Sequence, residues 1–203
     1  MLLPAAPFLF GATMTALITL ADYKTYKKIT KTENDEELTF IINSVSSMVK
    51  SYCGHSFIDY YTTPIEEVFN VNNTTQNSLQ LNEWPVNNIQ TIYSRPYYNS
   101  PYELIDSSMY YTDPITGSVY LITGDYWDTG YAAVKVKYTA GWETTPTDVK
   151  IACLDLVHHY YKEEYKERKQ IGNVSVDNSN RYVGIASKWP AHVSRVLHMY
   201  KNV

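Results

Sequence analysis

Two segments with helical periodicity enclose a long region of short alternating runs, and this division constrains the fold more than any other feature. Apolar residues recur at the i, i+3, i+4, i+7 spacing of one helix face over 38–52 and again over 149–160. Between these segments, residues 57–140 carry strand-like runs separated by turn residues. This order predicts an α+β protein, a small bundle of about four helices with an antiparallel β element inserted between the second and third helices.

Start and stop signals set the expected helix bounds. Thr19 is a typical N-cap residue, and Asn34 and Glu37 have the spacing of a capping box. Gly54 is a typical C-terminal stop, and Pro190 is a typical first residue of a helix. The expected helices therefore cover residues 20–29, 35–53, 147–169 and 190–201.

The central region reads as a series of short strands. The run Asp113 to Gly117 places proline and glycine at turn positions and predicts a hairpin. Val134, Val136 and Tyr138 alternate with lysines, which is typical of a half-buried strand. The expected strands are Glu67–Asn70, Ser78–Leu81, Ile89–Ser94, Met109–Thr112, Ser118–Ile122 and Ala133–Thr139. We expect residues 19–203 to form one domain.

The first 21 residues carry no charge. Prolines at positions 4 and 7 interrupt any early helix, and no basic segment precedes the apolar run, so neither a membrane span nor a signal peptide is expected. An apolar arm is costly in water, and we therefore predict that residues 1–18 dock on a neighbouring subunit. The alternative is that Met14 is the biological start.

Two further segments are candidates for contact with other subunits. The run at 161–169 is charged on every helix face, so it either lies in solvent or projects toward a partner. Residues 171–188 are rich in Gly, Asn and Ser and are expected to form a mobile loop that becomes ordered on assembly.

Composition limits the function classes. The formal net charge is −4, so the chain shows no overall basic character of the kind that grips DNA phosphates. Its 20 tyrosines suit half-buried contact surfaces, although an AT-rich genome would also favour tyrosine codons. Cys53 and Cys153 each lie among apolar residues of an expected helix, which predicts buried free thiols.

A search for catalytic and ligand-binding motifs finds none. The chain has no G-x-S-x-G elbow, phosphate-binding glycine loop or zinc-type cysteine spacing. His158 and His159 are adjacent and would point about 100° apart on a helix, so they cannot chelate one metal together. Acidic pairs such as Glu163–Glu164 are common on soluble surfaces. We therefore expect no enzyme activity, no cofactor and no metal.

The order of motifs resembles the head–tail connector, or adaptor, family of long-tailed bacteriophages. The chain has T-L-A-D-x-K-x-Y at 19–26, an aromatic-x-Gly-x-x-Phe signature at 52–57 and a Pro-Val pair at 85–86 between two strands. It continues with Y-T-A-G-W at 138–142, P-x-D-V-K-x-A at 146–152 and P-x-x-V-x-x-V-L-x-x-Y at 190–200. The resemblance covers nearly the whole chain except the first 18 residues.

The resemblance implies a structural virion protein without a cofactor. Family members form a ring, expected to be a dodecamer, that docks under the portal, extends the DNA channel and presents a platform to the downstream neck or tail protein. DNA would pass without sequence-specific binding, no membrane would be involved, and assembly would take place in the host cytoplasm. The alternatives are another neck or tail completion or terminator protein, a small hydrolase or a carbohydrate-binding module.

Projecting segments are what a head-to-tail ring interface requires. The candidate interface residues therefore come from the arm, the charged helix end, the loop and the last helix. They are Leu3, Phe8, Leu9, Phe10, Tyr161, Tyr165, Arg168, Ile171, Val174, Val176, Arg181, Tyr182, Val183 and Tyr200.

Overall fold

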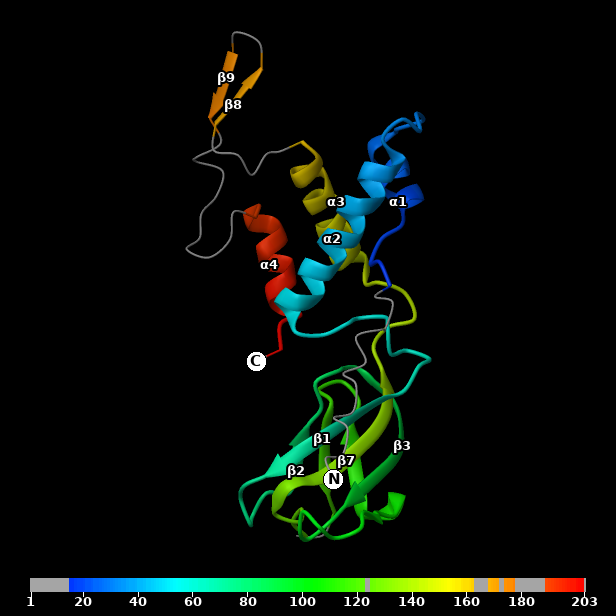
Figure 1. Ribbon diagram of the computed structural model, residues 1–203, viewed down its shortest axis with the longest axis vertical. Coiled ribbons are helices and arrows are strands. Elements are labelled where there is room, and N and C mark those ends of the chain that lie inside the picture. The colour runs from blue at the N-terminus through cyan, green and yellow to red at the C-terminus, as the bar shows by residue number, and fades with distance from the viewer. Residues whose placement is uncertain (1–14, 123–124, 163–167, 172–173, 178–188, 203) are drawn as a thin grey trace, which may run out of the picture.

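The helices gather at one end of an elongated molecule and the two larger sheets at the other (Figure 1). The computed structural model describes residues 15–122, 125–162, 168–171, 174–177 and 189–202. Its helices are α1 (Leu20–Lys27), α2 (Asp35–Cys53), α3 (Thr147–Tyr161) and α4 (Ala191–Met199). Its strands are β1 (Ile65–Val71), β2 (Ser78–Gln80), β3 (Val86–Ser94), β4 (Glu103–Leu104), β5 (Tyr110–Asp113), β6 (Ser118–Leu121), β7 (Gly130–Ala140), β8 (Arg168–Ile171) and β9 (Val174–Asp177). The α+β prediction is confirmed.

The four helices share one apolar core. The periodic face of α2 is buried against α3 and α4, and Tyr23 of α1 is buried in the same cluster. Cys53 and Cys153 are buried free thiols, as predicted, and burial raises the pKa of each to about 12. A thiol with such a pKa stays protonated at neutral pH, so both cysteines act as small apolar core residues.

Local signals predicted the ends of α2 well and those of α1 less well. The left-handed conformation of Gly54 ends α2, and its N–H donates to the Lys50 carbonyl. Lys28 also adopts a left-handed conformation, so α1 ends two residues before the predicted position. Thr19 forms a capping box with Asp22. The box predicted for Asn34 is wrong, because its side-chain amide donates to the Tyr161 hydroxyl instead.

Two antiparallel sheets pack on a second apolar core. One sheet has the order β1-β7-β3-β4 and the other β2-β6-β5. Val134 and Val136 of β7 share this core with Val119 of β6 and with Trp127. The predicted hairpin is confirmed, since Asp113 of β5 pairs with Ser118 of β6 across the turn.

The helix predicted for residues 147–169 is wrong at residues 168–169, and residues 163–167 lie outside the described part. The helix ends at Tyr161, and residues 168–171 form β8. The charged run offers no apolar stripe to pack on the bundle, and helices this short depend on such packing. The loop predicted for 171–188 is wrong at β9, where alternating Val and polar residues favour a strand that pairs with β8. The rest of that prediction lies outside the described residues.

The predicted arm at residues 1–18 is wrong at its last positions. Leu17 and Ile18 are buried in the helical core of their own chain. The Leu17 N–H donates to Ser46 Oγ at 3.0 Å, and its carbonyl accepts from Thr145 Oγ1 at 2.7 Å. Apolar residues directly before α1 thus serve the core. Residues 1–14 lie outside the described part. Among the helices of the described residues, none has the length and apolar character needed to cross a membrane.

Candidate functional site: the junction between helices and sheets

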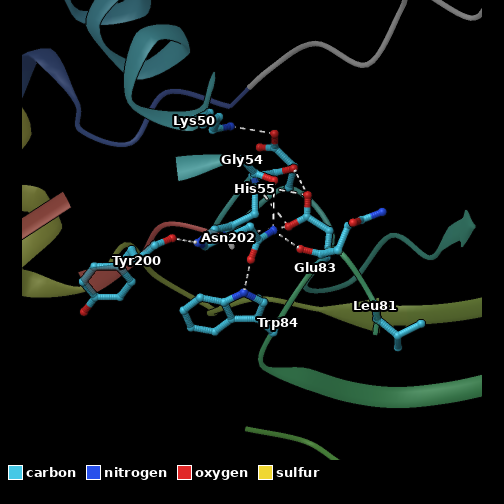
Figure 2. A network of polar contacts seen from close by, with 12 residues as sticks. Lys50, Gly54, His55, Leu81, Glu83, Trp84, Tyr200 and Asn202 are labelled. Carbon is cyan, nitrogen blue, oxygen red and sulfur yellow. Dashed lines mark hydrogen bonds and ion pairs between the residues drawn. The ribbon is translucent and has the colours of Figure 1, made fainter. Parts of the chain in front are cut away.

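The helix and sheet units meet at a compact polar and aromatic cluster, which we call the junction (Figure 2). Four separate segments supply it. They are the turn after α2, the segment before β3, the segment after β7 and the residues after α4. The junction residues discussed below are Gly54, His55, Ser56, Phe57, Asn82, Glu83, Trp84, Gly141, Trp142, Tyr200 and Asn202.

Asn202 binds three of these segments together. Its side-chain amide donates to the carbonyl of Gly54 at 3.1 Å and to that of Asn82 at 2.6 Å. Its side-chain oxygen accepts a hydrogen bond from Trp84 Nε1, and its backbone N–H donates to the Cys53 carbonyl at 2.8 Å. One amide therefore ties the end of α2 to the segment that enters β3.

Glu83, which is buried, and the half-buried Glu67 of β1 lie on the sheet side of the junction. Glu83 accepts hydrogen bonds from the Ser56 N–H at 3.0 Å and from Ser56 Oγ at 2.6 Å. The Tyr138 hydroxyl donates to Glu67 at 2.5 Å and accepts from the Glu83 N–H at 3.1 Å. Burial raises the pKa of both glutamates, and the hydrogen bonds that they accept oppose this rise.

His55 lies at the centre of the junction with a fully buried side chain. Burial lowers the pKa of its imidazole to about 4, so the ring is neutral at pH 7. Nε2 lies 3.1 Å from the Tyr200 carbonyl. Because a carbonyl can only accept, Nε2 carries the proton. Nδ1 then faces Glu83 Oε2 at 3.8 Å and has no hydrogen-bond partner among the described residues.

Aromatic rings cover this polar centre. Trp84 and Tyr200 stack with centroids 6.4 Å apart and an interplanar angle of 1°, and Phe57 and Trp142 pack against the same tyrosine. The Tyr200 hydroxyl donates to the Asp148 carboxylate at 2.9 Å. Burial, with this hydrogen bond to Asp148, raises the pKa of Tyr200 to about 12. Because these rings come from segments of both units, their packing helps to hold the two units together.

Gly141 lets the chain pass close to the turn after α2. Its φ is +93°, and a Cβ at this position would lie 2.0 Å from the Phe57 carbonyl oxygen. The Trp142 N–H donates to that same oxygen at 2.9 Å. Only glycine fits this approach.

Lys50 and Asp59 form an ion pair beside the junction. Lys50 Nζ lies 2.6 Å from Asp59 Oδ2 and donates to the Thr15 carbonyl at 2.8 Å. The pair joins the last turn of α2 to the segment before α1 and to the segment that leads to β1. Among the described residues, no cluster of three or more His, Cys, Asp or Glu side chains could hold a metal ion. The charged groups described above all contact other protein groups, and these contacts hold the segments of the junction in place.

The structure places only some of the predicted interface residues. Tyr161 is half-buried at the end of α3, where its hydroxyl accepts from Asn34 Nδ2 at 2.8 Å. Tyr200 belongs to the junction of its own chain. The four predicted residues at 168, 171, 174 and 176 lie on the β8–β9 hairpin. The remaining ones, namely Leu3, Phe8, Leu9, Phe10, Tyr165, Arg181, Tyr182 and Val183, lie outside the described residues.

Sequence reasoning missed an aromatic surface on the sheet unit. Tyr97, Tyr98 and Tyr131 are highly exposed, and the Arg95 guanidinium lies 4.7 Å from the centre of the Tyr98 ring. The Tyr98 and Tyr131 centroids are 6.0 Å apart. The high tyrosine content indicated such a surface, but composition does not show which tyrosines form it. Exposed aromatic groups are typical of contact surfaces.

This architecture is an α+β fold that the chain shares with chains from solved structures of GTA particles. One chain in the neck of an empty GTA particle, computed with C6 symmetry, has a TM-score of 0.61 and 12% identity. That match covers 99% of this chain and 94% of the other. A chain in the GTA neck computed with C12 symmetry has a TM-score of 0.59 and 13% identity over 96% of this chain and 93% of that one. GTA denotes a gene transfer agent. At these identities the likeness shows a shared fold.

The sequence gives the family. The family model described as head completion protein matches residues 16–203, and the chain belongs to this family. The head completion protein of Escherichia phage T5 is 33% identical over 69 residues, which are 34% of this chain and 38% of that protein. The match thus spans less than half of the relative. The predicted membership of a bacteriophage head–tail adaptor family is confirmed, and the chain is a structural virion protein.

Proposed function

We propose that this chain is a head–tail adaptor of the phage neck, arranged as a ring, expected to be a dodecamer, beneath the portal. The ring would extend the DNA channel and offer a platform to the downstream neck or tail protein. The observation that carries the proposal is the family match across nearly the whole chain. Solved neck structures with C6 and C12 symmetry share the fold, which supports a ring.

The physical character of the chain fits this role. A net charge of −4 favours passage of DNA over tight phosphate binding, so we propose that DNA slides through without sequence-specific contacts. The junction fixes the angle between a helix bundle and the β unit inserted between α2 and α3, and a ring needs identical subunits with one shape. Assembly in the bacterial cytoplasm is part of the same proposal.

We further propose that the ring contacts use Tyr161, the β8–β9 hairpin and the predicted residues of 1–14, 165 and 178–188. Tyr200 would support the interface indirectly, because its ring holds the junction. The exposed tyrosines around Tyr98 extend this contact surface to the sheet unit.

Reconstitution of infectious particles tests the proposal. Heads assembled without this protein are expected to package DNA but not to join tails, and added purified protein should restore joining. Native mass measurement of the protein mixed with portal should show a portal complex with bound subunits. A Gly141→Ala variant, expected to be strongly destabilised, is the negative control. Normal tail joining by heads that lack the protein would overturn the proposal.

A further inference from the structure

A cleft rimmed by lysines has a volume of about 520 Å³ and is lined by residues of the α1–α2 connection and of the end of α3. These two segments lie at the end of the helix bundle that points away from the two larger sheets (Figure 1). Lys27, Lys28, Lys31 and Lys162 line it. Apolar groups of Ile29, Leu38 and Tyr161 also line it, so the cleft combines positive charge with an apolar wall.

The charge of this cleft is unusual for an acidic protein. Glu33 is the one carboxylate among the residues that line it. Lys28 and Lys31 are exposed, and in the described part of the chain neither has a carboxylate within ion-pair distance. A segment that fits this cleft would carry acidic groups beside an apolar side chain.

The first turns of α2 present a surface of that composition. Phe40 is 72% exposed, although most large apolar side chains of the helices are buried. Glu36 and Glu37 precede it by four and three positions, so both carboxylates flank its ring on the helix surface. Both glutamates are exposed. We call Glu36, Glu37 and Phe40 the acidic knob.

The knob and the cleft face different directions. Leu38, which lines the cleft, lies two positions from both Glu36 and Phe40 along α2. At 100° per residue, these two side chains project about 160° away from Leu38. One subunit therefore cannot insert its own knob into its own cleft. Two complementary patches on opposite faces of one helix can generate a head-to-tail contact between copies, which closes into a ring when the rotation permits.

We infer that the acidic knob of one copy docks into the lysine cleft of the next copy, an inference that rests on the proposed ring. The occupant is a second copy rather than a nucleic acid, because phosphates would use the lysines but leave the apolar wall and Phe40 without a role. Phe40 would contact the apolar wall, while Glu36 and Glu37 would reach the lysines at the rim.

Charge reversal tests the contact with purified full-length protein added to heads that lack it. Glu36→Lys/Glu37→Lys alone and Lys28→Glu/Lys31→Glu alone should each weaken ring formation by about ten-fold or more, because like charges then face each other. The chain that carries all four changes should recover to within about three-fold. Glu103→Lys/Glu143→Lys is the matched control and should assemble normally. Circular dichroism confirms that each variant is folded.

Disulfide trapping gives a second readout. Thr30 lines the cleft and Thr39 lies beside Phe40 in a shallow hollow, and both are exposed. Mild oxidation of assembled Thr30→Cys/Thr39→Cys protein should give a ladder of covalent oligomers, whereas either single variant should give none. The native cysteines are buried and should not react.

The outcomes separate this contact from the proposed function. If rings form on heads but the ladder is absent and charge reversal is harmless, the knob-to-cleft contact is wrong and the adaptor role stands. If wild-type protein does not bind heads at all, the adaptor role fails and this inference fails with it.

Discussion

Replacement of Lys50 by methionine tests whether the ion pair beside the junction stabilises the fold. Methionine keeps the length and the apolar stem of lysine, so the packing of α2 should change little. The loss of the ammonium removes the 2.6 Å contact with Asp59 and the hydrogen bond to the Thr15 carbonyl. The Asp59 carboxylate then stays behind with only 13% of its side chain exposed.

The expected cost follows from this burial. Removal of one partner from a buried ion pair typically costs about 3–5 kcal/mol, because the other charge is left uncompensated. Asp59 is partly exposed, so we expect a loss near the lower end, about 3 kcal/mol, in the free energy of unfolding. The double variant Lys50→Met/Asp59→Asn should recover part of this loss, because no buried charge then remains.

Equilibrium unfolding in urea, followed by tryptophan fluorescence, measures the free energy of unfolding of each variant. The m-value should be the same in wild type and variants, so that a shifted midpoint reports a change in stability. Lys24→Met is the matched control. It breaks a 2.8 Å pair with Asp35 whose side chains are 17% and 29% exposed, so about 1 kcal/mol or less is expected. A loss below about 1 kcal/mol in Lys50→Met, or equal losses in both lysine variants, would refute the reasoning.

Two further predictions concern the junction. Gly141→Ala should lower the free energy of unfolding by more than about 3 kcal/mol, because its Cβ would overlap a carbonyl oxygen. Gly130→Ala, whose Cβ would meet nothing within 4 Å, should cost about 1 kcal/mol in the same urea titration, and similar losses would contradict the close approach. The folded-state pKa of His55, about 4, lies below the unfolded value of about 6.5. The contribution of His55 to the free energy of unfolding is therefore complete above pH 6.5 and is lost as the pH falls toward 4. The raised pKa of Glu83 acts in the opposite direction, so wild type must be compared with His55→Gln at pH 7 and pH 4.5. Between pH 7 and pH 4.5, the free energy of unfolding of the wild type should fall by up to about 3 kcal/mol more than that of the variant. Parallel pH profiles would disprove the lowered pKa of His55.

Local sequence patterns predicted the helices and strands in which buried residues recur at a regular spacing. The bounds of α2 agree with the prediction because its apolar face has a regular period and Gly54 ends it. The strands were placed within a few residues because turn residues separate them, but the two-residue β4 has no pattern of its own. The extension of the third helix to residue 169 failed because charged residues favour a helix only weakly without an apolar face.

The junction could not be predicted from local sequence. His55 bonds to the Tyr200 carbonyl, and Asn202 bonds to Asn82, in contacts that only the assembled fold brings together. Asparagine is an ordinary surface residue in any sequence window, and the role of Asn202 comes from its hydrogen bonds to two distant segments, the end of α2 and the segment before β3. Tyr200 belongs to a motif of the family resemblance and was separately predicted to lie at a subunit interface. Its ring and hydroxyl contact its own chain, and the interface role stays a prediction.

The interleaved order of the two units has a consequence for synthesis. All strands of the two larger sheets, β1 to β7, have been synthesised once the ribosome has translated residue 140. The helix α2, by contrast, packs on α3 and α4, which are translated later. The exposed apolar face of α2 must therefore wait for its neighbours while the sheets are already able to fold. A nascent chain cannot close the junction until Asn202 has emerged, and so it cannot take up the fixed shape of a subunit before then.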